Sequence, residues 1–171
     1  SYNRVDNYTE KVQRKYDIEI LESLESVAEK ADAILLESCD GRQHLEQFKA
    51  IAPYKKPVFI DKPMACSSED AIKIAQISQE VECPIFSASS LRYYSGVRDY
   101  AAKKGKSQNL LGLEIFGPAD LPEDYPGFYW YGIHMASIAY QLMGQGCESV
   151  QVLSHNENLT SVNATWRGNR N

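Results

Sequence analysis

The sequence predicts an α/β fold, in which a parallel sheet of strand–helix units precedes an α+β region with a mostly antiparallel sheet. Up to about residue 89, short apolar runs alternate with amphipathic helical segments. Each run ends in a polar loop, as strands of doubly wound sheets do. Beyond residue 90, helices are followed by two strand-like segments close together. We therefore expect two domains, residues 1–89 and 90–171.

Three strands are predicted in the first domain. Residues 31–36 form a nearly unbroken apolar run, and residues 57–60 and 84–86 form two more. Such short apolar runs are typical of buried strands in a parallel sheet. Residues 17–21 alternate between polar and apolar side chains, which indicates a further short strand or the approach to one.

Amphipathic helices are predicted between these strands. The apolar spacing of residues 22–30 and 42–51 is helical, and Pro53 ends the second helix. A third helix follows residue 66, with Ser67 or Ser68 as its N-cap. The order strand–helix–strand–helix–strand predicts right-handed crossovers and hence a parallel sheet.

Polar residues follow the ends of the three strands: Glu37-Ser38, Asp61-Lys62 and residues 87–90. Because the crossovers share one hand, these loops should meet at one edge of the sheet and form a cleft there. Pro63 restricts the backbone of Lys62 to extended angles. Lys62 is therefore a candidate site residue, and the alternative is an ordinary solvated turn, since lysine and aspartate are mostly exposed.

The second domain is predicted from the pattern after residue 90. Residues 91–104 indicate a helix, and residues 109–116 a strand. Residues 132–143 form a helix that is apolar on most sides, so we expect it to be buried. Residues 150–153 and 159–166 read as strands that should pair in antiparallel fashion.

Composition excludes several classes of protein. The 171 residues are 43% hydrophobic and 24% charged, as in ordinary globular proteins. The net charge of −5 and the lack of a long basic run argue against nucleic acid or an anionic membrane as partner. No apolar stretch is as long as a membrane span. The scattered cysteines form no Cys-x-x-Cys pair, which is typical of reduced thiols in a cytoplasmic protein.

Few side chains are candidates for chemistry. His134 lies in the first turn of the predicted helix 132–143, and a neutral imidazole suits proton transfer near pH 7. The alternative is a core histidine with satisfied hydrogen bonds. Arg92 could bind a substrate oxygen or form a structural ion pair, and His44 lies on a helix face. The histidines lack metal-ligand spacing, so we expect no metal site.

Several segments resemble the Gfo/Idh/MocA family of NAD(P)-dependent oxidoreductases. The run from Asp32 through His44 to Asp61-Lys62-Pro63 is similar to a family segment that carries Glu-Lys-Pro at the last three positions. Leu91-Arg92-Tyr93 resembles the family's Arg-Tyr element, and Gly132-Ile133-His134 with residues 142–144 resembles its catalytic-histidine helix. These segments match in order over residues 17–170.

The resemblance implies a partial Rossmann-type dinucleotide-binding domain in residues 1–89 and part of a substrate and oligomerisation domain in residues 90–171. It implies an enzyme that moves a hydride between NAD or NADP and a hydroxyl of a sugar, inositol or related polyol. Lys62 would orient that hydroxyl or take its proton, and His134 would be its acid/base partner. A lysine next to the positive nicotinamide would have a lowered pKa.

The resemblance also implies binding residues. Ser38, His44, Asp61 and Pro63 would line the cofactor side together with Lys62. Arg92 would lie at the substrate mouth, where Lys62 and His134 also contact the substrate. The full-length protein would be a homo-oligomer.

Two departures from the family pattern are visible. Trp130 stands four residues before His134, where the family often has an aspartate that orients the imidazole. The Gly-x-Gly-x-x-Gly turn that holds the pyrophosphate is absent from these residues and is expected upstream of Ser1, so the sequence resembles the middle of a longer protein. Trp130 motivates an alternative, a non-catalytic sugar-binding or scaffold member of the same fold. A plain structural or oligomerisation domain is a third hypothesis.

Overall fold

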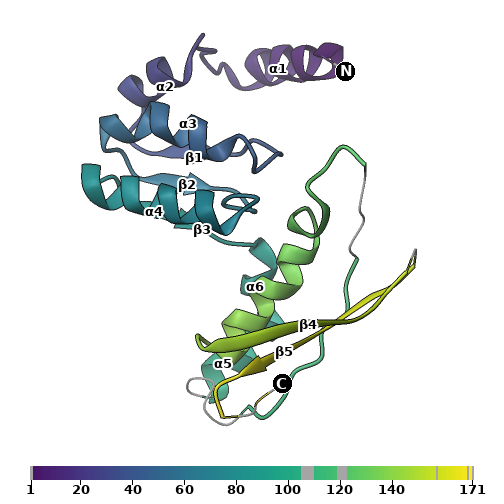
Figure 1. Cartoon of the computed structure of the whole chain (residues 1–171). Helices are drawn as coiled ribbons and strands as arrows, with labels where there is room; N and C mark the ends of the chain where they lie inside the picture. Colours follow the sequence, from purple (N-terminus) through teal and green to yellow (C-terminus); the bar gives the residue numbers. More distant parts are fainter. Residues whose placement is uncertain (1, 105–109, 119–122, 157, 169, 171) are drawn as a thin grey trace.

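Three parallel strands in the order β1, β2, β3 form the first sheet of the protein (Figure 1). They are β1 (Ile34–Leu36), β2 (Val58–Ile60) and β3 (Ile85–Ser87). This computed structural model describes residues 2–104, 110–118, 123–156, 158–168 and 170. The predicted parallel sheet is confirmed, with β2 as its central strand.

Helices connect the strands in the predicted order. α2 (Leu24–Lys30) precedes β1, α3 (His44–Ile51) and the 3-10 turn η1 (Ala52–Tyr54) join β1 to β2, and α4 (Ser68–Val81) joins β2 to β3. Ser67 is the N-cap of α4, because its hydroxyl accepts a hydrogen bond of 3.0 Å from the amide of Asp70.

The buried core lies within residues 28–83. Phe48 of α3, Ile60 of β2 and Ile74 of α4 are each fully buried. Because the apolar faces of α3 and α4 pack against the sheet, the strands keep their carboxyl ends at one edge. The core therefore supports the loops that follow β1, β2 and β3.

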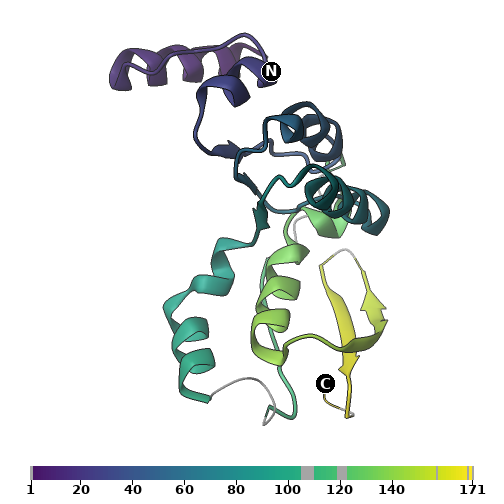
Figure 2. The ribbon, with the colours of Figure 1, turned by 90° about the vertical axis from the view of Figure 1, so that its left-hand side faces the viewer.

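One prediction near the start of the chain is wrong. α1 (Tyr2–Tyr16) lies at the opposite end of the molecule from the strands of residues 147–166 in both views (Figures 1 and 2). Residues 17–21 connect α1 to α2 and form no strand, so that prediction is wrong. The reason is a missing partner: Ile18 and Ile20 are each 45% exposed, and none of the strands in the described residues pairs with them.

The second part of the chain contains helices and one antiparallel pair. The predicted helix 91–104 is divided into η2 (Ser90–Tyr93) and α5 (Ser95–Lys104). The short turn η3 (Gly127–Tyr129) leads to α6 (Gly132–Met143), which has the predicted bounds. β4 (Cys147–His155) and β5 (Thr160–Trp166) pair in antiparallel fashion, as predicted.

Two expectations for this part are wrong. Residues 110–116 form no strand, and residue 109 of the predicted strand lies outside the described residues. α6 is also less buried than expected, since among its residues only Met143 is fully buried. Residues 113 and 115–117, α6 and the β4–β5 pair all line an apolar cavity of about 390 Å³, so this part of the α6 surface is not filled by side chains.

The predicted domain boundary near residue 89 falls between β3 and η2, where the parallel sheet has ended. We retain residues 1–89 and 90–171 as the proposed division. In the described part of the chain, no helix has the length and apolar character needed to cross a membrane.

Candidate functional site

The central strand β2 leads directly into the predicted site. Val58 is 2% exposed and Ile60 is fully buried, so the strand is anchored in the core. The amide of Asp61 still donates to the carbonyl oxygen of Leu36 at 2.9 Å, and the Lys62–Pro63 peptide bond that follows is cis. Pro63 is fully buried and Lys62 is half-buried. Lys62 thus begins where strand pairing ends, on a supported backbone.

His44 joins two of the loops at this edge. Its ring is fully buried, with Nδ1 2.9 Å from the carbonyl oxygen of Pro63 and Nε2 2.9 Å from that of Ser38. Both ring nitrogens are therefore engaged by the backbone. His44 holds the loop after β1 against the loop after β2, so any effect on a cofactor would act through the position of these loops.

Gly41 allows these two loops to approach closely, and sequence reasoning missed it. A Cβ atom at this position would lie 2.7 Å from Cγ of Pro63 and 2.9 Å from its carbonyl oxygen. Such distances are shorter than van der Waals contact, so only glycine fits without movement of the backbone. The signal available in the sequence was a lone glycine after a predicted strand, which is a weak one.

Ser38 contacts its own domain. Its hydroxyl donates to Oε1 of Gln47 on α3 at 2.8 Å, and the side chain is half-buried. This bond fixes the loop after β1 to the helix that follows it. The predicted cofactor-side position of Ser38 at the carboxyl edge of the sheet is compatible with this contact.

Lys62 contacts the second part of the chain. Its Nζ donates to the backbone carbonyl of Trp130 at 3.3 Å. The same atom lies 4.8 Å from the centre of the Trp130 ring and 5.6 Å from that of Tyr131. Both distances are within the range of cation–π attraction. The ammonium is therefore positioned by the segment that leads into α6.

His134, in the first turn of α6, is half-buried and contacts a serine. Its Nδ1 lies 2.7 Å from Oγ of Ser89, which follows β3. Burial lowers the pKa of His134, and the positive charge of Lys62 lowers this pKa further, while Asp61 acts in the opposite direction. The influence of Lys62 means that the two predicted catalytic side chains, which come from different parts of the chain, are electrostatically coupled.

Arg92 hydrogen-bonds to a neutral side chain rather than forming the structural ion pair that was one of its two expected roles, and its expected contact with a substrate stays a prediction. Its Nε and Nη2 both donate to Oε1 of Gln141 on α6, at 3.1 and 2.7 Å. Its guanidinium also lies 5.7 Å from the centre of the Tyr93 ring. These contacts hold η2 against α6, and they place Arg92 on the α6 face that also carries Ser137 and His134.

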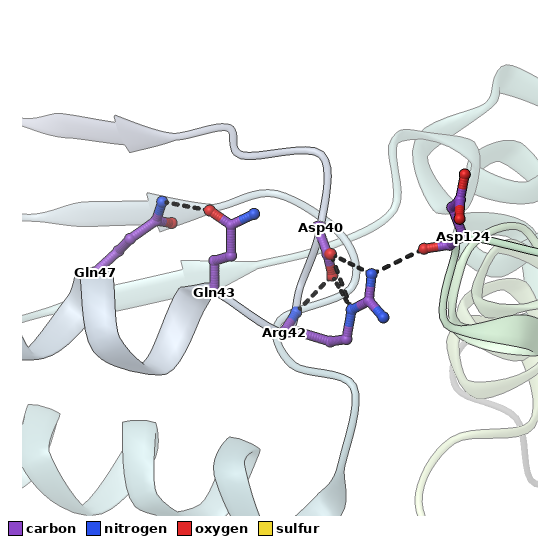
Figure 3. Close-up of polar contacts among 5 residues, drawn as sticks. All are labelled: Asp40, Arg42, Gln43, Gln47 and Asp124. Atoms are coloured by element: carbon purple, nitrogen blue, oxygen red, sulfur yellow. Dashed lines mark hydrogen bonds and ion pairs between the residues drawn. The ribbon is translucent and has the colours of Figure 1, made fainter. Parts of the chain in front are cut away.

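A bridge between the two parts of the chain was not predicted (Figure 3). Arg42 forms a salt bridge of 2.6 Å with Asp40, and its Nη2 also donates to the backbone carbonyl of Asp124 at 2.8 Å. The hydrogen bonds from Arg42 lower the pKa of Asp40. The loop before η3 therefore contacts the parallel-sheet part of the chain, and it does so through the backbone carbonyl of Asp124. Within the described residues, no carboxylate of this loop hydrogen-bonds to His134.

Metal binding has no support in the described residues, where no group of three or more His, Cys, Asp or Glu side chains could hold an ion. The loops after β2 and β3 instead contribute the ammonium of Lys62 and the buried hydroxyl of Ser89, and α6 contributes the imidazole of His134. Such a set can bind a substrate oxygen and exchange a proton with it.

Comparison with known proteins gives both sequence and structural relatives. Over 76 residues, the chain is 28% identical to inositol 2-dehydrogenase 2 of Mycolicibacterium vanbaalenii, which covers 44% of this chain and 22% of that protein. A probable dehydrogenase from Thermotoga maritima has a TM-score of 0.80 at 22% identity, covering 96% of this chain and 56% of that one. The WlbA dehydrogenase from Bordetella pertussis, solved with NADH and UDP-GlcNAcA, has a TM-score of 0.67 at 18% identity, covering 92% and 52%.

The structural likeness at these identities shows a shared fold. The chain spans about half the length of these two solved relatives. The family model described as "Oxidoreductase family, NAD-binding Rossmann fold" matches residues 2–89, more than half of the chain. The chain therefore belongs to the Gfo/Idh/MocA oxidoreductase family.

Proposed function

We propose that the protein is an oxidoreductase that transfers a hydride between NAD or NADP and a hydroxyl of a sugar, inositol or related polyol. Lys62 and His134 are the proposed catalytic residues. The observation that carries the proposal is the contact of Lys62 with the segment leading into α6, because it brings the ammonium near the imidazole. Hydride removal from an alcohol carbon requires loss of the hydroxyl proton, and this pair can manage that proton.

The residues present fit one end of a dinucleotide. The carboxyl edge of β1, β2 and β3 carries Ser38, Asp61 and Lys62, and the close packing of Gly41 on Pro63 leaves these loops well defined. Ligands of doubly wound sheets bind at such an edge. When bound, the nicotinamide supplies the hydride acceptor or donor. The nicotinamide would be held by Ser38, Asp61, Lys62 and Pro63. His44 would act indirectly, because its buried ring contacts the backbone of the loops that carry these residues.

The substrate class rests on the relatives and on the side chains opposite the sheet. An inositol dehydrogenase and an enzyme solved with a sugar nucleotide are among the similar proteins. Lys62 and His134 provide hydrogen-bonding groups for adjacent hydroxyls, and Arg92 binds Gln141 on the α6 face that carries His134. We also propose that the protein acts as a homo-oligomer in the cytoplasm, which light scattering and localisation of the tagged protein would test.

Coenzyme titration followed by a turnover assay tests the proposal. The intact, full-length protein should enhance and shift nicotinamide fluorescence when titrated with NADH or NADPH, whereas residues 1–171 alone should bind either coenzyme poorly, because they lack the glycine-rich turn for the pyrophosphate. With the preferred coenzyme, it should then oxidise or reduce at least one of myo-inositol, a free aldose or a UDP-linked sugar. Failure of both coenzymes to bind would contradict the proposal.

A second candidate is a non-catalytic sugar-binding member of the family. The Trp130 and Tyr131 rings cover the Lys62 ammonium, and Tyr125 stacks on Trp130 with 4.1 Å between ring centres. Aromatic rings of this kind could bind the apolar face of a sugar. This function would be favoured if Lys62→Ala and His134→Ala left sugar binding intact and no polyol were ever turned over.

A further inference from the structure

The hydroxyl of Ser89 is buried between two partners. Ser89 is 2% exposed, and its Oγ accepts a hydrogen bond of 3.1 Å from the amide of Leu91. The same oxygen lies 2.7 Å from Nδ1 of His134. Of the residues that the structure describes, only His134 offers the Ser89 hydroxyl proton an acceptor. Since a buried hydroxyl proton without an acceptor is costly, Ser89 should donate to Nδ1.

This direction of the hydrogen bond determines where the imidazole carries its proton. A neutral imidazole has one N–H, and a ring that accepts at Nδ1 must carry it on Nε2. Nε2 of His134 makes no hydrogen bond to any described residue. It is therefore the nitrogen left for a ligand, and it would face that ligand as a donor.

The surroundings of the ring favour its neutral form. Burial and the nearby charge of Lys62 hold the pKa of His134 below its ordinary value, with Asp61 as the opposing charge. Tyr131 contributes the edge of its ring, 5.6 Å away between centres. Trp130 directs its carbonyl oxygen to Lys62, not to the imidazole. A carboxylate on Nδ1 would favour a charged ring, whereas a serine hydroxyl does not.

We infer that Ser89 is a positioning residue that holds His134 as the neutral tautomer protonated on Nε2, so that His134 orients a substrate oxygen by hydrogen bonding while Lys62 exchanges the proton. This inference rests on the proposed function. In the direction of carbonyl reduction, the Lys62 ammonium would donate a proton to the substrate oxygen, and the reduced nicotinamide, when bound, would supply the hydride for the carbonyl carbon. The Nε2 proton of His134 remains on the ring.

Nuclear magnetic resonance of the ¹⁵N-labelled protein tests the tautomer without turnover. A long-range ¹H–¹⁵N spectrum near neutral pH should show His134 with a protonated Nε2 and an unprotonated Nδ1. The protein has three histidines, and the signals of His134 are the ones that disappear in the His134→Gln variant. A protonated Nδ1 or a fully charged ring in the wild type would overturn the inference, whether or not the protein proves to be an oxidoreductase.

Variants at Ser89 show whether this residue orients the imidazole of His134 or only supports the fold. Ser89→Ala should give mixed tautomers, whereas Ser89→Thr keeps the hydroxyl and should restore the wild-type spectrum. Ser90→Ala, at the exposed neighbouring position, is the matched control and should leave the spectrum unchanged. In a turnover assay, Ser89→Ala should lower kcat by about tenfold with little change in KM, less than the ~10²–10³ lost when an oxyanion donor is removed. A wild-type tautomer pattern in Ser89→Ala would contradict the assigned role.

Discussion

Nζ of Lys62 lies 3.3 Å from the carbonyl oxygen of Trp130, so the second residue after the central strand of the parallel sheet contacts the segment that leads into α6. These two residues are 68 positions apart. The contact brings an ammonium toward His134 and determines what each group can do. It also explains why neither part of the chain contains the whole candidate site.

Replacing Lys62 with methionine should abolish most of the proposed turnover. Methionine keeps the volume of the side chain but cannot exchange a proton, so kcat should fall by roughly 10²–10⁴-fold. The measurement is the rate of change of nicotinamide absorbance under saturating substrate. Lys73→Met on α4 is the matched control, because Lys73 is paired with Glu69 on an exposed helix face. An unchanged rate in Lys62→Met would exclude Lys62 from catalysis.

The lowered pKa of His134 predicts how stability depends on pH. The unfolded state binds a proton to this imidazole at higher pH than the native state does, so stability should rise with pH across this range. As the pH falls from about 7.5 to about 5, through the ordinary imidazole range, the wild type should lose stability relative to His134→Gln. Denaturant titrations of both proteins at several pH values measure this difference. A constant difference would mean that His134 has an ordinary pKa in the native state.

A methyl group at Gly41 should destabilise the carboxyl edge of the sheet. The added Cβ would lie 2.7 Å from Cγ of Pro63, and because Pro63 is fully buried, the loop would have to move. We expect Gly41→Ala to lower the free energy of unfolding by about 1–3 kcal/mol. Coenzyme affinity should decrease as well.

Gly96→Ala is the control for this change, because its nearest neighbour is the ring of the exposed Tyr94 at 3.3 Å and the site lies in helix α5. It should be neutral or slightly stabilising. Equal denaturation midpoints for the two variants would show that the contact of Gly41 with Pro63 is not restrictive.

Replacing His44 with phenylalanine should separate the loops after β1 and β2. The ring volume is retained, but the N–H that His44 donates to the carbonyl oxygen of Ser38 or of Pro63 is lost, and neither oxygen gains a new donor. Each unsatisfied group costs about 1–3 kcal/mol, so the free energy of unfolding should fall by several kcal/mol. His155→Phe is the control, since His155 is exposed and its ring hydrogen-bonds, among the described residues, to Thr160 alone. A loss of coenzyme binding without a loss of stability would instead indicate direct contact with the cofactor.

Local patterns in the sequence were sufficient for much of the fold. The apolar runs ending at Leu36, Ile60 and Phe86 and the capping serine Ser67 predicted the parallel sheet and its helices. Hydrophobic periodicity and helix N-caps depend on residues within a few positions of one another, so they can be recognised in the amino-acid sequence. The same reasoning was wrong for residues 17–21 and 110–116, because a strand also needs a partner, and pairing is not a local property.

Some of the candidate site residues could be predicted from the sequence, but their contacts could not. Lys62 and His134 could be chosen from their positions after a strand and at the start of a helix. The Ser89 hydroxyl on His134, the Trp130 carbonyl on Lys62 and the Arg42 bridge to Asp124 join residues 45, 68 and 82 positions apart. Such contacts depend on how the two parts of the chain pack against each other. This packing results from many weak interactions between residues far apart in the sequence, so a short sequence pattern cannot predict it.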